Sequence, residues 1–282
     1  MKNVFFLAFL SVLASCGSAS FKKDEVTSIK RVAIVAYSIP EKIEFRDDPK
    51  EQNKAGVMDL VKMVAKSFTE VDGKRAAELS YNEFVKSINT STNLPFKALT
   101  LEELRKNVKF QELVTASQKK ETPVAAASDT GWMGKLQSLA GSNEVVPSST
   151  TVAGIATFGI DKNWSDSDAL MKTEEEKAFL KKSLEILNVD AIMVINDMGY
   201  SFSCEACIAG TGSASTGSAF NVTLINKDMK RVMNVRQWFG FSKASAPIVT
   251  GIIPPPMYEK LFTAHGGKMA TEFISETESQ LK

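Results

Sequence analysis

Ala191-Ile-Met-Val-Ile195 is an unbroken run of apolar residues, and Arg31-Val-Ala-Ile-Val-Ala-Tyr37 is a second one near the other end of the chain. Both runs are short and rich in β-branched residues, which is typical of strands buried on both faces of a sheet. Residues 220–225 alternate between apolar and polar, turn through Asn226-Lys-Asp228 and return over 231–241. That pattern predicts a β-hairpin beside the buried strands.

Helical periodicity surrounds these strands. Apolar residues recur at helical spacing over 57–68, 75–89 and 257–281, and Gly266-Gly267 is expected to bend the last of these helices. Thr100-Leu-Glu-Glu103 and Thr173-Glu-Glu-Glu176 have the capping-box form, in which the hydroxyl and the last carboxylate bind free backbone N–H groups. Each should open a helix.

The order of elements is strand, helices, strand, helix, strand, hairpin and helix. We therefore expect an α/β (α+β) fold, with a single mixed β-sheet, helices packed on it, a β-hairpin near the C-terminus and a C-terminal helix. The domain should span residues 30–282. Small and polar residues at about 118–152 indicate a flexible excursion from it.

The charge balance excludes some partners. Lys and Arg number 34 and Asp and Glu 33, which gives a formal net charge of +1. A neutral body has no electrostatic field to collect nucleic acid, so no nucleic-acid partner is expected. The chain contains one histidine, which removes most hydrolytic and metal chemistry, and no cofactor is expected.

The N-terminus carries a lysine at position 2 and a short apolar segment that ends in Leu13-Ala14-Ser15-Cys16. The apolar segment is too short for a transmembrane helix, which needs about 20 residues, and suits a secretory signal. Its end resembles a bacterial lipobox. The resemblance implies removal of residues 1–15 and acylation of the Cys16 thiol. An ordinary signal peptide, cut after Ala14 or near Ser18, is the alternative.

On the lipoprotein interpretation, acyl chains on Cys16 anchor the protein to a lipid bilayer. Residues 16–29 are polar and mostly small and predict a tether that lets the domain stand off the membrane. The position after Cys16 is Gly17, whereas an aspartate there resembles a retention signal for the inner membrane. We therefore expect the bacterial outer membrane, with the body in the periplasm. The inner membrane and the cell surface are the alternatives.

The body also resembles periplasmic lipoproteins of the curli-secretion and TolB amino-terminal type. The resemblance rests on Leu187-Asn-Val-Asp-Ala-Ile-Met-Val-Ile-Asn196, on the hairpin around Leu224-Ile-Asn-Lys-Asp228 and on the C-terminal helix. In the turn, Asn226 and Met229 stand where that family favours Asp and Gly. The resemblance implies the fold and the compartment, and no functional residue is carried over from it.

The most specific chemical motif of the body is Cys204-Glu-Ala-Cys207. Outside the cytoplasm, two cysteines that are left after lipidation of a third favour a structural disulfide. A thioredoxin-like redox pair would need its first thiol at a helix N-terminus, and a zinc site would need four ligands, of which only His265 could join the two sulfurs.

Glycines and hydroxyls follow the cysteines, and the stretch lacks the P-loop ending and the dinucleotide fingerprint. It predicts a flexible loop over 209–218. If this loop binds a ligand, the hydroxyls and N–H groups suit a polar glycan or peptide. The candidate residues are Gly210, Thr211, Gly212, Ser213 and Ser215.

No Gly-x-Ser-x-Gly nucleophile elbow occurs in the sequence, so His265 has no nucleophile to activate. The leading hypothesis is therefore non-enzymatic: a membrane-anchored envelope protein that binds another envelope protein or its own copies. A small-ligand or glycan-binding module that uses residues 209–218 is the alternative, and an enzyme built from sequence-distant carboxylates comes third.

Overall fold

A computed structural model describes residues 19–40, 44–45, 73–118, 149–156, 173–197, 201–208, 211–239, 245–248 and 255–282. The helices in these ranges are α2 (Lys23–Ser28), α4 (Gly73–Thr90), α5 (Leu101–Lys106), α6 (Val108–Gln118), α8 (Glu174–Leu187) and α9 (Pro255–Leu281). The strands are β1 (Ala19–Phe21), β2 (Arg31–Pro40), β3 (Glu44–Phe45), β4 (Lys97–Ala98), β5 (Ser149–Thr151), β6 (Ala191–Asp197), β7 (Ser201–Ile208), β8 (Thr211–Asn226), β9 (Arg231–Phe239) and β10 (Ser245–Ile248).

The strands join in one mixed sheet whose main path is β1-β9-β8-β6-β2-β4. β2 runs parallel to β4 and β6, whereas the pairs β6–β8, β8–β9 and β9–β1 are antiparallel. The α/β class with a single mixed sheet, a hairpin and a C-terminal helix is confirmed, and the hairpin is formed by β8 and β9.

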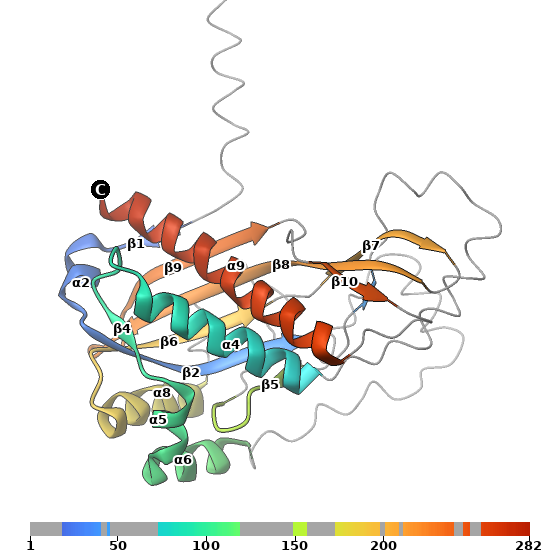
Figure 1. The fold of residues 1–282 in the computed structure, drawn as a ribbon. Helices are drawn as coiled ribbons and strands as arrows, with labels where there is room; N and C mark the ends of the chain where they lie inside the picture. The colour runs from blue at the N-terminus through green and yellow to red at the C-terminus, as the bar shows by residue number, and fades with distance from the viewer. Residues whose placement is uncertain are drawn as a thin grey trace, which may run out of the picture.

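β8 is long enough for its two halves to pair with different strands. Its C-terminal half, from Ser218 onward, lies between β6 and β9. Its N-terminal half lies between β7 and β10, where Ser215 is in register with both Ser203 and Ser245. The sheet therefore continues beyond the main path at one end, to the right in Figure 1.

Two groups of helices cover the sheet. α4 and α9 lie side by side across one face, in front of the strands in Figure 1, and contact β2, β8 and β9. α5, α6 and α8 form a second group below the sheet in that view, where α8 contacts β6 and β2. Because the central strands pack against helices, Val32–Tyr37 of β2 and Ala191–Ile195 of β6 are buried, as their continuous apolar runs predicted.

Both predicted capping boxes are present. The Thr100 hydroxyl accepts a hydrogen bond from Glu103 N at the start of α5, and the Thr173 hydroxyl accepts one from Glu176 N at the start of α8. α8 ends at Asn188, which is left-handed at φ 48°. A left-handed C-cap turns the chain sharply, and this turn delivers Asp190 to the start of β6.

Gly266-Gly267 do not interrupt the C-terminal helix, because α9 runs from Pro255 to Leu281 as one element. Gly266 instead lies against α4: a Cβ atom there would stand 2.1 Å from the carbonyl oxygen of Ser80. The Ser80 hydroxyl also donates a hydrogen bond to the carbonyl of Phe262, at 3.1 Å. The glycine serves close contact between two helices, since only a residue without a side chain fits.

The predicted tether over residues 16–29 is wrong for the part that the structure describes. Ala19–Phe21 form β1, which pairs with Met233–Val235 of β9. α2 follows at once and buries Val26 in the core. The sequence-based interpretation failed here because β1 is held by backbone hydrogen bonds, which leave little trace in side-chain composition.

The helix expected over 57–68 lies wholly outside the described residues. Residues 119–148 of the expected excursion lie outside them as well. At the edges of that excursion, Gln118 ends α6, and Ser149–Thr151 pair with β2 as β5.

Candidate functional site

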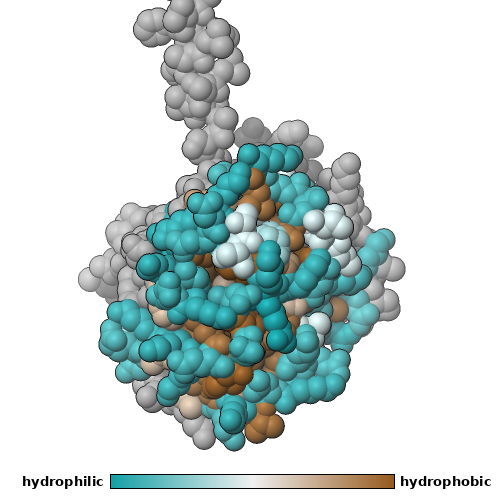
Figure 2. All heavy atoms as spheres, turned by 90° about the vertical axis from the view of Figure 1, so that its left-hand side faces the viewer, coloured by the Kyte–Doolittle hydropathy of each residue, from teal (hydrophilic) through white to brown (hydrophobic). Residues whose placement is uncertain are grey.

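A shallow pocket of about 440 Å³ opens at the end of the sheet where β2 and β6 begin and the β8–β9 turn projects. We call it the end pocket, and it is lined by Glu25, Ser28, Ile29, Asp190, Asn226, Lys227, Asp228 and Lys230. Figure 2 looks onto this end of the molecule, where hydrophilic side chains cover most of the surface and hydrophobic atoms show between them.

Asp190 fixes the floor of the end pocket. Its Oδ2 atom accepts hydrogen bonds from the backbone N–H groups of Lys30 and Arg31, both at 3.0 Å, and its Oδ1 atom accepts one from the Lys227 ammonium group at 3.0 Å. One carboxylate thus joins the start of β2, the start of β6 and the hairpin turn.

The pKa of Asp190 reflects two opposed effects. Partial burial raises the pKa, but the hydrogen bonds from Lys227 and from the backbone N–H groups of Lys30 and Arg31, with the charge of Lys227, outweigh it. The pKa of this carboxyl is therefore held below its ordinary value, and Asp190 is ionised at neutral pH. The carboxylate is an acceptor of hydrogen bonds and not a proton donor there.

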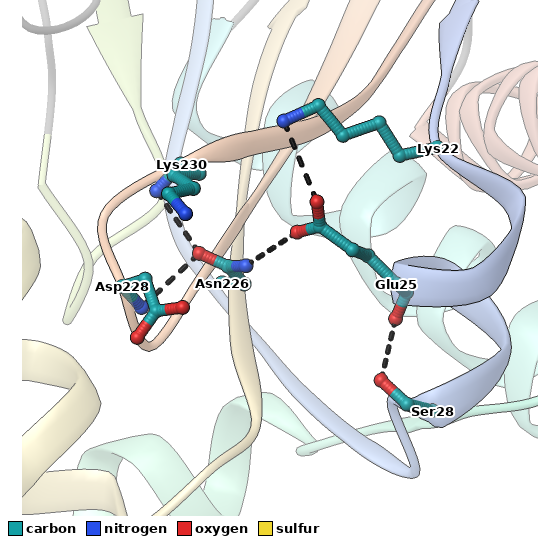
Figure 3. Close-up of polar contacts among 6 residues, drawn as sticks. All are labelled: Lys22, Glu25, Ser28, Asn226, Asp228 and Lys230. Carbon is teal, nitrogen blue, oxygen red and sulfur yellow. Dashed lines mark hydrogen bonds and ion pairs between the residues drawn. The ribbon is translucent and has the colours of Figure 1, made fainter.

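Asn226 shapes the turn that forms one wall of the end pocket, shown in Figure 3. Its Oδ1 atom accepts hydrogen bonds from the backbone N–H groups of Asp228, at 3.1 Å, and Lys230, at 2.9 Å. This Asx-type bonding closes a turn without help from other segments. Met229 takes the left-handed conformation in it, at φ 58°, the position where the resembling family favours glycine.

The opposite wall belongs to α2. The Nδ2 group of Asn226 donates a hydrogen bond to a carboxylate oxygen of Glu25 at 2.7 Å, and Lys22 forms an ion pair with Glu25 at 3.5 Å. Ser28 lies one turn further along α2, and its hydroxyl donates to the Glu25 carbonyl at 2.7 Å. A chain of polar contacts thus links α2 to the hairpin turn across the pocket (Figure 3).

These groups favour recognition over catalysis. Glu25, Asp190 and Asn226 each hold another segment in place, and the basic and acidic side chains of the pocket are interspersed. An open pocket with this mixture of charges suits the polar rim of a protein interface. Asp190 and Asn226 lie within the segments that carry the family resemblance, but no pattern in the sequence predicts a role for either residue.

The predicted ligand-binding loop is a strand. Thr211, Gly212, Ser213 and Ser215 all belong to β8, and Gly212, Ser213 and Ser215 pair with β10. Ser215 is buried. Gly210 lies outside the described residues, as does Cys16. Small residues allowed neighbouring strands on both sides of β8 here, where composition alone predicted a flexible connection.

The predicted disulfide is not formed in the structure either. Cys204 and Cys207 are both part of β7 and were expected at a turn. The pairing of β7 with β8 is irregular between Glu205 and Ile208, and the two cysteines do not stand at disulfide distance, which requires Cα atoms within roughly 7 Å. His265, the other residue considered for a metal site, is buried in α9.

Sequence reasoning missed a set of buried polar residues on the sheet. Asn196 of β6, Asn221 of β8 and Arg236 of β9 stand in one cross-strand register. Two residues further along β8, on the same face, the Nδ2 group of Asn234 donates a hydrogen bond to the Thr223 hydroxyl at 2.9 Å. The four neutral members are buried. Their signal is the alternation of polar and apolar residues in the hairpin strands.

This polar set points away from α9. The Thr277 hydroxyl of α9 contacts the sulfur of Met233, and Gln237 donates a hydrogen bond to Glu276 at 3.1 Å. Since successive side chains of a strand alternate between faces, Asn234 and Arg236 point to the other face of β9.

No protein-family model matches the chain, and a search of curated proteins finds no match to it. Within the ranges that the structure describes, no cluster of three or more metal-ligating side chains occurs. No helix in these ranges is long and apolar enough to cross a membrane.

Proposed function

We propose that the protein is a bacterial lipoprotein of the outer membrane, anchored through acylated Cys16, whose body binds an envelope protein or a second copy of itself without catalysing a reaction. The observation that carries the binding role is the end pocket, where charged and amide side chains from three segments form an open, preorganised rim. Its side chains are already positioned by mutual hydrogen bonds, so a partner would not have to order them on binding.

The anchor is supported by the lipobox-like sequence that ends in Cys16. Several acyl chains on one residue satisfy the rule that stable attachment needs more than a single chain. Metabolic labelling with an alkynyl fatty acid tests this step. Label should enter the native protein and the Cys204→Ser variant equally, and Cys16→Ala should lose both the label and its association with membranes. A Cys16→Ala protein that keeps both would contradict the anchor.

The binding role is tested by placing a photoreactive amino acid at Lys230, an exposed residue on the rim of the end pocket. Lys109, exposed on α6, serves as the matched control position. Irradiation of intact cells should give a discrete adduct from Lys230 and none from Lys109. An adduct of twice the chain mass identifies a second copy, and a different mass identifies another protein. Equal adducts at both positions, or none at either, would refute the role of the pocket.

A further inference from the structure

The short distance along the chain between Cys16 and β1 sets how the body can sit on a membrane. Only Gly17 and Ser18 separate Cys16 from Ala19, the first residue of β1. Three Cα–Cα steps of 3.8 Å span at most about 11 Å. An acylated Cys16 therefore holds β1 within about 11 Å of the residue that carries the lipid.

β1 is firmly part of the folded body. It pairs with β9 over Ala19–Phe21, and the backbone N–H of Lys22 donates a hydrogen bond to the carbonyl of Val232 at 2.9 Å. Val26 of α2 is completely buried. The restraint on β1 is thus a restraint on the whole sheet, and not on a loose N-terminal segment.

The sheet gives this restraint a direction. β1 is the last strand at one end of the main path and β4 the last at the other, five inter-strand steps away. At about 4.8 Å a step, the far edge lies roughly 24 Å from β1. α5 begins three residues after β4, and Figure 1 shows α5 and α6 on the side of the molecule away from β1.

From these distances we propose that the lipid anchor holds the β1 edge of the sheet against the bilayer surface, so that β4, α5 and α6 face away from it. Lys22 and Lys23 are exposed directly after β1, where they can contact the phosphate groups of anionic lipids. The end pocket then lies near the membrane, because α2, which follows β1 directly, forms one of its walls. This inference rests on the proposed acylation of Cys16.

Fluorescence quenching in vesicles tests the orientation. The mature protein, purified from membranes, is labelled through an unnatural amino acid at Lys23 or at Lys109, two exposed helical lysines. It is placed in vesicles of phosphatidylethanolamine and phosphatidylglycerol that contain a lipid with a nitroxide on its headgroup. Mass spectrometry of the N-terminal peptide of the same sample reads the acylation separately.

We expect several-fold stronger quenching at Lys23 than at Lys109. A flexible Gly/Ser insertion of about twelve residues after Ser18, which spans about 20 Å, should reduce that difference. Acylated protein with equal quenching at both positions, or stronger quenching at Lys109, overturns the orientation and leaves the proposed function standing. Protein without an acyl chain on Cys16 overturns both.

Discussion

The contact between α4 and α9 and the end pocket are held together by different forces. Between the helices, Gly266 approaches the backbone of Ser80 so closely that no side chain fits, and Phe84 and Phe273 meet beside it with ring centroids 5.7 Å apart. At the end pocket, hydrogen bonds and ion pairs span segments that remain open to water. Close packing leaves no room for an added side chain, whereas each exposed ion pair contributes little to stability, so the loss of one costs little.

The difference separates what the fold needs from what a partner can use. Changes between the helices should strongly destabilise the fold, while changes at the end pocket should alter the surface at a smaller cost in stability. The expected effects therefore fall as substitutions move from the helix contact to the turn.

The largest effect is expected from Gly266→Ala. A Cβ atom 2.1 Å from the Ser80 carbonyl oxygen must push the helices apart, at a cost of about 3 kcal/mol, the upper end for overpacking. Urea denaturation measures the change in the free energy of unfolding. Gly267→Ala is the matched control, because its Cβ would meet Glu83 at an ordinary 3.6 Å, and better helix propensity should make it neutral or stabilising by up to about 1 kcal/mol. Equal losses in both variants would contradict this account.

Asp190→Asn should come second. An amide oxygen can still accept hydrogen bonds from the backbone, but the charge that binds Lys227 is gone, so we expect a loss of about 1–2 kcal/mol in urea denaturation. Asp228→Asn replaces an exposed carboxylate at the same end of the molecule and should change stability by less than about 0.5 kcal/mol. A larger loss in Asp228→Asn than in Asp190→Asn would show that the contacts of Asp190 are not the main stabilising contacts at this end of the molecule.

The same pair of proteins predicts a pH dependence. Because the pKa of Asp190 is lowered in the folded state, the unfolded chain takes up the proton first as the pH falls, and the native state loses this stabilisation. The contribution is fully present above the unfolded value of about 3.9 and disappears as the pH falls through the folded pKa. The stability difference between the native protein and Asp190→Asn should therefore shrink below about pH 4. A difference that grows there would reverse the sign of our argument.

Substitutions of Asn226 separate the two hydrogen bonds that close the turn from the one that reaches Glu25 of α2. Asn226→Ala removes all three side-chain hydrogen bonds and should cost about 1–2 kcal/mol. Asn226→Asp keeps the two bonds that close the turn but places two carboxylates together at Glu25, so its smaller loss should be relieved by adding Glu25→Gln. Thermal unfolding of the two single variants and the double variant measures this coupling. If Glu25→Gln gives no relief, the contact across the pocket does not contribute.

Met229→Gly should have the smallest effect. Glycine removes the strain of a left-handed conformation, which costs roughly 1–2 kcal/mol in a residue with a side chain, but it also removes the partial packing of Met229 against the core. We expect the two to offset within about 0.5 kcal/mol in urea denaturation. A large loss would show that packing dominates at this turn.

Sequence patterns predicted those parts of the fold whose stability lies in side chains. β2 and β6 are visible as apolar runs because both of their faces are buried, and the helices opened by Thr100 and Thr173 are visible because the caps are made by particular side chains. The errors fall where backbone decides. The pairing of β1 with β9 needs no characteristic side chain, and neither does the pairing of Ser213 in β8 with β7 and β10. A tether and a loop were therefore predicted there.

The sequence indicated only some of the residues that form the end pocket. Asp190 and Asn226 were noticed as parts of two phrases that lie far apart in the sequence, but neither phrase indicates that Lys227 and Glu25 connect them. These contacts depend on the three-dimensional meeting of α2, β6 and the hairpin turn. The left-handed conformation of Asn188, after which the chain turns toward Asp190, is one that asparagine adopts more readily than most residues, so this part of the site does have a local signal.

The length of β8 carries a mechanical consequence. Its sixteen residues run without interruption from the partners β7 and β10 to the turn at Asn226. A slip by one residue would exchange the two faces of the strand, so any sliding must occur in steps of two along the whole strand. We expect that a displacement of β8 along its axis at Ser213 would also strain the turn at Asn226, because one continuous strand joins the two.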